Sequence, residues 1–185
     1  MDDTCIQRVI EGDVNSFRYL VDKYKDMSFS IAMSVLKDED DAQDAVQESF
    51  IKAFKNLKSF RRESKFSTWL YKIVVNESLS RIRAKKQERT QYVDEYKDHG
   101  SHVGETVLNL AQDEQKKYIN KVLNMMESRE SLLLRLFYLN ENNLNEIEEI
   151  TGLSSGNIRV ILHRARKNFY DLMKTELKEE INSLL

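Results

Sequence analysis

The stretch NLNEIEEITGLSSGNIRVILHRARKNFYDL, residues 143–172, predicts two helices joined by a tight turn. Ile147 and Ile150 mark the apolar face of the first helix, and Gly152 stands where the chain must reverse through a left-handed residue. Either Ser154 or Ser155 can cap the second helix. Apolar residues then recur at helical spacing, at Ile158, Ile161, Leu162, Ala165, Phe169 and Leu172. This pattern is typical of a helix-turn-helix, whose second helix usually enters the DNA major groove.

The second helix of this pair is basic although the chain as a whole is slightly acidic. Between Thr151 and Asn168 there are four Lys or Arg residues, one His and no Asp or Glu, whereas the formal net charge of the chain is -2. Such a local charge indicates a directed contact with nucleic acid. The alternative is an ordinary helical hairpin with a basic, solvated face. That alternative does not explain why the turn residues, the spacing of the core residues and the charge all favour a helix-turn-helix.

The composition predicts an all-α fold. The 185 residues include no proline and only five glycines, and no window alternates apolar and polar residues for long. No apolar run approaches eighteen residues and the N-terminus has no apolar signal core, so we expect a cytoplasmic protein without membrane insertion. A single cysteine, Cys5, excludes an internal disulfide framework and a cysteine-rich zinc site.

Apolar periodicity divides the chain into two small helical domains joined by a flexible linker. Helices are expected over about 15–36, from about 40, and over about 68–86. Their inward residues are expected to be Phe17, Leu20, Tyr24, Met27, Ile31 and Val35, then Ala42, Val46, Phe50, Ala53, Phe54 and Leu57, then Leu70, Ile73, Val74, Leu79 and Ile82. The periodicity fades beyond residue 87 and returns near Tyr118. We therefore expect domains over 1–90 and 113–185, with a linker over 91–112.

The charge changes sign within the first domain. Residues 38–48 hold six Asp or Glu and no Lys or Arg, whereas residues 61–91 hold nine Lys or Arg and three Glu. Four aromatic residues lie among these cations: Phe60, Phe66, Trp69 and Tyr71. Cations that follow phosphates and rings that stack on bases are what single-stranded nucleic acid requires. The alternative is that Phe66 and Trp69 are core residues. Tyr71 should face a different way from Trp69 on the same helix, so we expect that these aromatic side chains cannot all point inward.

The order of these pieces resembles a known family, the extracytoplasmic-function (ECF) group of bacterial RNA polymerase sigma factors of the sigma-70 family. The resemblance rests on DDAQDAVQESFIKAFKNLKSF, on RRESKFSTWLYKIVVNESLSRIRAKK and on SSGNIRVILHRARKNF. It implies sigma domain 2 and sigma domain 4, a function in transcription initiation without enzymatic activity, and no cofactor or metal. The implied partners are core RNA polymerase and promoter DNA, both double- and single-stranded, and the resemblance also allows an anti-sigma factor.

The resemblance implies roles for individual residues. Binding of the clamp helices of the largest polymerase subunit falls to Asp41, Asp44, Gln47, Glu48 and Phe50. Recognition and melting of the downstream promoter element fall to Arg61, Lys65, Phe66, Trp69, Lys72, Asn76, Arg81 and Arg83. Recognition of the upstream element falls to Ser155, Asn157, Arg159, His163, Arg164, Arg166 and Lys167. The segment 132–138 would meet the flap of the second-largest subunit.

The chain departs from the family pattern within the helix-turn-helix. Glu148 replaces a residue that is usually small, and it must lean outward or pair with a cation. Val160 and Ile161 replace a pair that is commonly polar or basic, which removes at least one expected DNA contact.

Two other functions compete with a promoter-specificity factor. A stand-alone helix-turn-helix regulator would explain the C-terminal half but not the order of charges in the N-terminal half. A metal-dependent enzyme could use Asp94, Asp98, His99 and His102, although this weak ligand pattern lies in the expected linker. Packing of the two domains on each other, if it occurs, would cover the basic helices.

Overall fold

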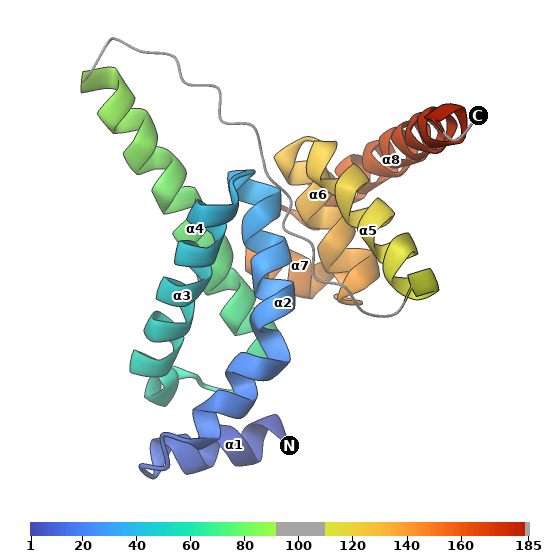
Figure 1. Cartoon of the computed structure of the whole chain (residues 1–185). Coiled ribbons are helices and arrows are strands. Elements are labelled where there is room, and N and C mark those ends of the chain that lie inside the picture. Colours follow the sequence, from blue (N-terminus) through green and yellow to red (C-terminus); the bar gives the residue numbers. More distant parts are fainter. Residues whose placement is uncertain (92–109, 184–185) are drawn as a thin grey trace.

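The computed structural model describes residues 1–91 and 110–183, with side chains over 1–87 and 115–176, and this part of the chain is entirely helical. The N-terminal body contains α1 (Asp2–Ile10), α2 (Ser16–Leu36), α3 (Glu39–Lys55), the 3-10 turn η1 (Leu57–Ser59) and α4 (Phe66–Gln91). The C-terminal body contains α5 (Leu110–Met125), α6 (Ser128–Leu134), the π-helical segment η2 (Arg135–Leu139), α7 (Leu144–Thr151) and α8 (Ser155–Ser183) (Figure 1). The predicted all-α architecture with two helical bodies is confirmed. Within the described ranges, no helix is long and apolar enough to cross a membrane.

The boundaries of α2 and α3 follow from local chemistry. Lys37 ends α2 in the left-handed conformation, with φ 58°. The Asp38 side chain then accepts a hydrogen bond from the backbone N of Asp41 at 2.9 Å and so caps α3. The acidic first turn of α3 is favourable at a helix N-terminus, because the exposed N–H groups there carry partial positive charge.

The helix-turn-helix forms as the sequence predicts. Asn143 and Glu146 make a capping box at the start of α7, and Gly152 ends that helix at φ 71°. The Ser154 hydroxyl accepts from the backbone N of Asn157 at 3.4 Å, so Ser154 rather than Ser155 caps α8. The inner face of α8 is buried, at Ile158, Ile161, Leu162 and Ala165.

Three residues expected to point inward in the N-terminal body do not, and one helix was not expected. Leu79 and Ile82 are 36% and 41% exposed rather than inward, because the side of α4 that faces α3 is taken here by Arg81 and Lys85, which pair with Asp44 and Asp41. Phe54, also expected inward, is 38% exposed at the end of α3. The last turns of α4 extend beyond α2 and α3 (Figure 1). Helix α1 was not expected, yet it buries Ile6 and Val9 under the bundle. The contact that holds it is long-range, since the Tyr24 hydroxyl and the Lys23 ammonium both donate to the Asp2 carboxylate.

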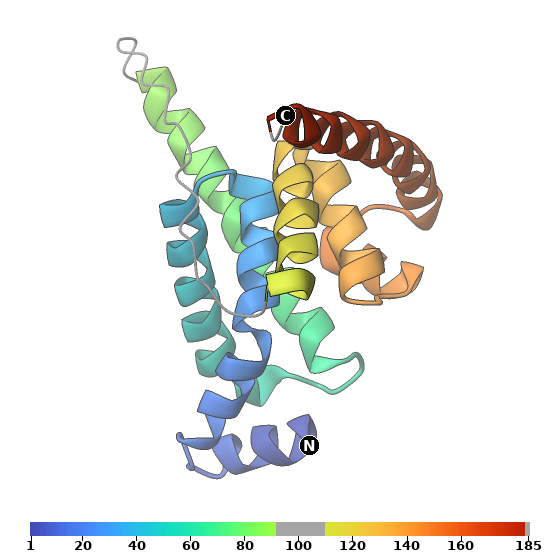
Figure 2. The same cartoon turned by 45° about the vertical axis from the view of Figure 1, so that its right-hand side comes forward.

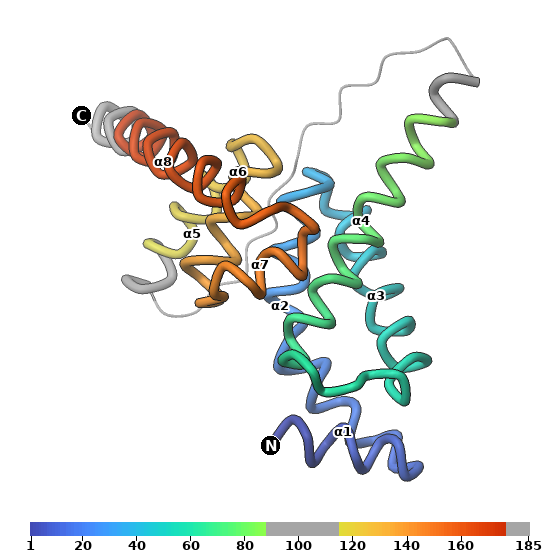
Figure 3. Tube along the Cα trace, turned by 180° about the vertical axis from the view of Figure 1, so that it is seen from behind, coloured from blue at the N-terminus to red at the C-terminus, as the bar shows by residue number. Residues whose placement is uncertain are grey.

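The two bodies pack against each other. α2 lies between α3 on one side and α5 and α6 on the other, and α7 lies against the first half of α4 (Figures 2 and 3). At this contact the Ser131 hydroxyl donates to that of Ser34 at 3.2 Å, and the Ser64 hydroxyl donates to the Glu149 carboxylate at 3.1 Å. The basic face of α8 stays exposed in this arrangement, and so do Lys72 and Arg83 of α4, so the expectation that packing would cover the basic helices was wrong.

Candidate nucleic-acid interface

The outward face of α8 is an exposed row of polar and basic side chains over a buried apolar face. Asn157, Arg159, His163, Arg166 and Lys167 are all exposed, while Ser155 at the first position is half-buried. Because the opposite side of the helix carries the core residues, helical geometry fixes which side chains a groove of DNA would meet.

Arg164 is exposed but held in place by a buried acid. Glu130 on α6 is 4% exposed and accepts from Arg164 Nε at 2.7 Å and from Asn168 Nδ2 at 2.8 Å. Charge-assisted hydrogen bonds of this kind fix the orientation of a guanidinium group. The sequence reading missed Glu130 and Asn168, because their link to Arg164 joins residues far apart in the chain.

The departures within the helix-turn-helix have different structural consequences. Glu148 leans outward and is exposed, which is one of the two outcomes expected for it. Ile161 is buried in the core of the C-terminal body and lies away from the outward face. Val160, by contrast, is 68% exposed and lies near the centre of that face, between Arg159 and His163. Of the two substitutions, only Val160 therefore lies where it can meet DNA.

Helix α4 has two faces of different character. Lys72, Asn76, Leu79 and Arg83 follow one another at intervals of four, three and four residues, and all are exposed on one side. Arg81 lies on the opposite side, where it pairs with Glu77 on its own helix at 3.5 Å. The basic stretch of the sequence is thus divided between an open face and a face turned toward α3.

The side of α4 that faces α3 is neutralised by ion pairs. Lys85 pairs with Asp41, and Arg81 Nη1 lies 3.6 Å from Asp44 Oδ2. These pairs join residues expected to bind polymerase to residues of the basic segment. Gln47 is exposed, Glu48 is half-buried and Phe50 is in the core. The acidic helix therefore presents only part of its charge to a partner.

The aromatic residues of the basic segment form a cluster at the start of α4. Phe66 is 5% exposed and packs between Phe60, Trp69 and Tyr24, with ring centroids 5.8, 5.8 and 5.5 Å away. Trp69 is half-buried. The prediction that these rings cannot all point inward was wrong for Tyr71, which is also buried, because its side of the helix lies against the C-terminal body.

The loop before α4 carries two exposed cations at its ends, Arg61 and Lys65. Lys65 Nζ lies 2.8 Å from Glu146 Oε1 on α7 and so bridges the two bodies. Burial opposes ionisation of the Glu146 carboxyl, but hydrogen bonds from Lys65 and from the backbone N of Asn143 outweigh it and lower the pKa of Glu146.

No group of three His, Cys, Asp or Glu side chains that could hold a metal occurs among the residues whose side chains the structure describes. The ligand pattern suggested by Asp94, Asp98, His99 and His102 lies outside those residues.

Known proteins match this chain over most of its length. A family model described as Sigma-70 region 2 matches residues 20–88. The ECF RNA polymerase sigma factor SigW of Bacillus subtilis is 32% identical over 174 residues, which are 88% of this chain and 91% of that protein. The chain belongs to the ECF sigma factors of RNA polymerase. The ECF RNA polymerase sigma-E factor of Haemophilus influenzae is 40% identical over 83 residues, 45% of this chain and 43% of that protein.

Two solved structures share the fold of this chain. RpoE of Bartonella quintana, in complex with the anti-sigma factor NepR, has a TM-score of 0.65 at 24% identity and covers 85% of this chain and 96% of its own. CnrH, in complex with the cytosolic domain of CnrY, has a TM-score of 0.62 at 19% identity and covers 93% of this chain and 96% of its own.

This sigma factor directs RNA polymerase to promoters, and its family is non-enzymatic. Core RNA polymerase is therefore a partner, and the prediction of a promoter-specificity factor is confirmed over that of a stand-alone regulator.

Proposed function

We propose that this sigma factor recognises a two-part promoter through the open face of α4 and the outward face of α8. The observation that carries the proposal is the row Lys72, Asn76 and Arg83, which lies on one exposed side of α4, whereas Arg81 and Lys85 on the side toward α3 are ion-paired. A row of cations with one amide among them can follow phosphates and contact a base edge. In this proposal the chain contains sigma domain 2 over residues 1–90 and sigma domain 4 over residues 113–185, and the linker between them is residues 91–112.

Melting of the downstream element is assigned to the aromatic cluster and the cations around it. The candidates remain Arg61, Lys65, Phe66, Trp69, Lys72, Asn76, Arg81 and Arg83. The half-buried indole of Trp69 is better presented to a base than Phe66, which is part of the core. Likewise Arg83 is open to a phosphate, whereas Arg81 would first have to leave Asp44 and Glu77.

The upstream element is assigned to Ser155, Asn157, Arg159, His163, Arg164, Arg166 and Lys167. Arg159 lies in the first turns of α8, where recognition helices reach base edges, whereas Arg166 and Lys167 lie further along and suit phosphates. Val160 presents only methyl groups to the groove. The apolar group that a base offers in the major groove is the thymine methyl, so Val160 is assigned to a thymine of this element.

Core polymerase is assigned to two apolar grooves and the charges beside them. A groove of about 440 Å³ between α2 and α3 is lined by Val21, Phe29, Val46, Gln47 and Phe50, next to Asp44. It suits the clamp helices of the largest subunit; Asp41 and Glu48 are assigned to the same contact, although Asp41 would first have to leave Lys85 on α4. A second groove of about 290 Å³, lined by Ile119, Leu123, Tyr138, Leu139 and Phe169, suits the flap of the second-largest subunit.

An anti-sigma factor is proposed as a further partner. The support is that the sigma factor RpoE, which shares this fold, is found in complex with the anti-sigma factor NepR, and that CnrH, of the same fold, is found with the cytosolic domain of CnrY.

Transcription from a promoter library with core RNA polymerase tests the assignment. Asn76→Ala should change sequence preference in the downstream element only, and Arg159→Ala in the upstream element only. Lys167→Ala is the matched control, because loss of a phosphate contact weakens all promoters alike and lowers the salt dependence. Equal losses on every promoter for Arg159→Ala and Asn76→Ala would contradict base recognition by these residues.

A further inference from the structure

A buried arginine without a carboxylate partner lies in the C-terminal body. Arg135 begins the π-helical segment η2 and is 2% exposed. Its Nη1 donates to Asn120 Oδ1 at 2.7 Å and its Nη2 to Asn124 Oδ1 at 3.0 Å, while Nε has no hydrogen-bond partner. The structure gives this guanidinium no ion pair among the residues whose side chains it describes. Both acceptors are neutral amides, so the buried charge is solvated but not compensated.

A second cation reaches the same region from the N-terminal body. Lys37 leaves the end of α2 in the left-handed conformation, and its Nζ donates to the carbonyl oxygens of Asn124 at 2.9 Å and Leu123 at 3.4 Å. Burial and, to a smaller extent, the charge of Arg135 lower the pKa of Lys37 to about 8, while Glu127 opposes the shift. Two cations of opposite bodies therefore destabilise each other across the contact.

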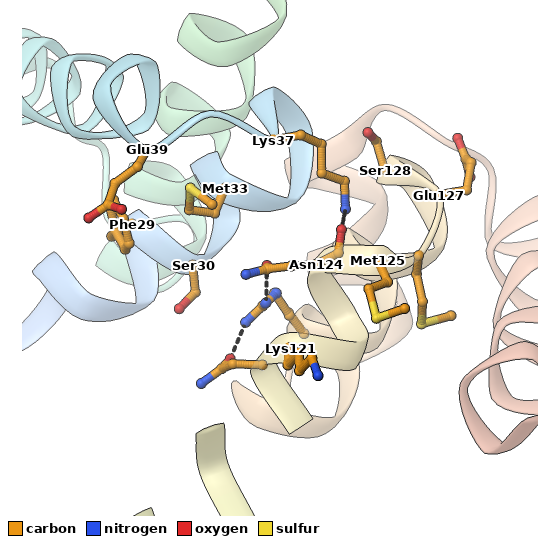
Figure 4. A pocket seen from close by; sticks show the side chains of 13 residues that line it. Phe29, Ser30, Met33, Lys37, Glu39, Lys121, Asn124, Met125, Glu127 and Ser128 are labelled. Carbon is orange, nitrogen blue, oxygen red and sulfur yellow. Dashed lines mark hydrogen bonds between the residues drawn. The ribbon is translucent and has the colours of Figure 1, made fainter. Parts of the chain in front are cut away.

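Both cations line one cavity of about 940 Å³ between α2, α5 and α6. Figure 4 shows Lys37 reaching from the end of α2 to Asn124, with Phe29 and Met33 on the α2 side of the pocket and Met125 on the α5 side. The other charged groups of its lining are Glu39, Glu127 and Lys121. They have partners of their own, because Glu39 accepts from Gln43, Glu127 caps α6 and Lys121 pairs with Glu176. A volume of this size suits a small molecule.

We propose that this cavity binds a small organic anion, whose carboxylate or phosphate group lies between Arg135 and Lys37 and whose apolar part packs on Phe29, Met33 and Met125. The two cations belong to different bodies, so a bound anion would attract both and stabilise the packed arrangement of the sigma factor. The π-helical segment supports this assignment, because such segments are frequent at functional sites.

Isothermal titration and thermal unfolding of the full chain test the proposal without polymerase or DNA, so the result is independent of promoter recognition. The probes are octanoate, acetate and inorganic phosphate, each compared with sodium chloride at equal ionic strength. Saturable binding of at least one oxyanion with a raised Tm is expected, and chloride should give neither. Tighter binding of octanoate than of acetate would show that an apolar part of the ligand packs in the cavity. Binding of phosphate but of neither carboxylate would identify the charged group of the ligand as a phosphate. No saturable binding of any oxyanion would overturn the proposal.

Variants decide whether these two cations form the site. Arg135→Gln should weaken the binding at least about tenfold, because a buried charge loses its counter-charge. Arg159→Gln is the matched control, since it removes an exposed guanidinium elsewhere and should leave the affinity unchanged. If Arg135→Gln does not fold, Lys37→Gln decides, with an expected loss of roughly threefold or more because a charged hydrogen bond is removed. Unchanged affinity in Lys37→Gln and in any folded Arg135→Gln would overturn the assignment.

Discussion

Replacing Val160 by Ala should weaken promoters that carry thymine at one upstream position. Val160 is 68% exposed on the outward face of α8, so about two thirds of its surface is available for contact. Val→Ala removes two methyl carbons at about 0.8 kcal/mol each when they are buried. With about half of that area covered by a thymine methyl and its neighbours, the loss is about 1 kcal/mol, or roughly fivefold in affinity.

Uracil provides the complementary change on the DNA side, because it lacks only the methyl group of thymine. Replacing each upstream thymine in turn should identify one position where the wild-type holoenzyme loses about fourfold. With the Val160→Ala holoenzyme the same replacement should lower the affinity for the duplex less than about twofold, because the effects of two groups that contact each other are not additive. Filter binding of the holoenzyme to a short promoter duplex measures all four combinations.

Val14→Ala is the control, because Val14 is also an exposed valine, at 59%, but lies before α2 and far from α8 in the sequence. It should leave both duplexes unaffected. If the thymine-to-uracil penalty is the same with Val160→Ala as with the wild type at every position, then Val160 does not contact a thymine methyl and the reasoning fails.

Three further predictions concern stability and docking. Glu130→Ala should lower the free energy of unfolding by about 2 kcal/mol, because two side chains lose a buried acceptor, and an unchanged urea midpoint would contradict this. Because its pKa is lowered on folding, Glu146 stabilises the protein above its unfolded pKa of 4.5, and this stabilisation is lost as the pH falls through the folded pKa. Lys65→Met should therefore reduce the difference in the free energy of unfolding between pH 6 and pH 3, measured with urea. Asp44→Ala combined with Gln47→Ala should weaken binding to core polymerase several-fold in a pull-down titration, and wild-type affinity would refute docking on α3.

Local patterns predicted most of the helices, because their causes lie within a few residues. The cap at Ser154, the left-handed Gly152 and the apolar stripe of α2 each depend on neighbours in sequence, and each was found where expected. Helix α1 escaped prediction because its main polar contact, from Tyr24 to Asp2, spans 22 residues.

The candidate interface was predictable in kind but not in detail. The sequence places cations on α4 and α8, yet it does not say which of them are already paired. Arg81 and Arg83 look alike in the sequence, but one turns toward Asp44 and the other toward solvent. The burial of Tyr71 depends on packing between the two bodies, which no local pattern encodes.

The ion pair between Lys65 and Glu146 links opening of the molecule to engagement of DNA. In the packed arrangement Lys65 has a carboxylate of the helix-turn-helix as its partner, and in the proposed promoter complex it would contact DNA instead. One ammonium group cannot satisfy both anions fully, so Glu146 is an internal competitor of DNA. By reciprocity, whatever separates the two bodies raises the affinity of the N-terminal body for DNA, and DNA bound there favours their separation.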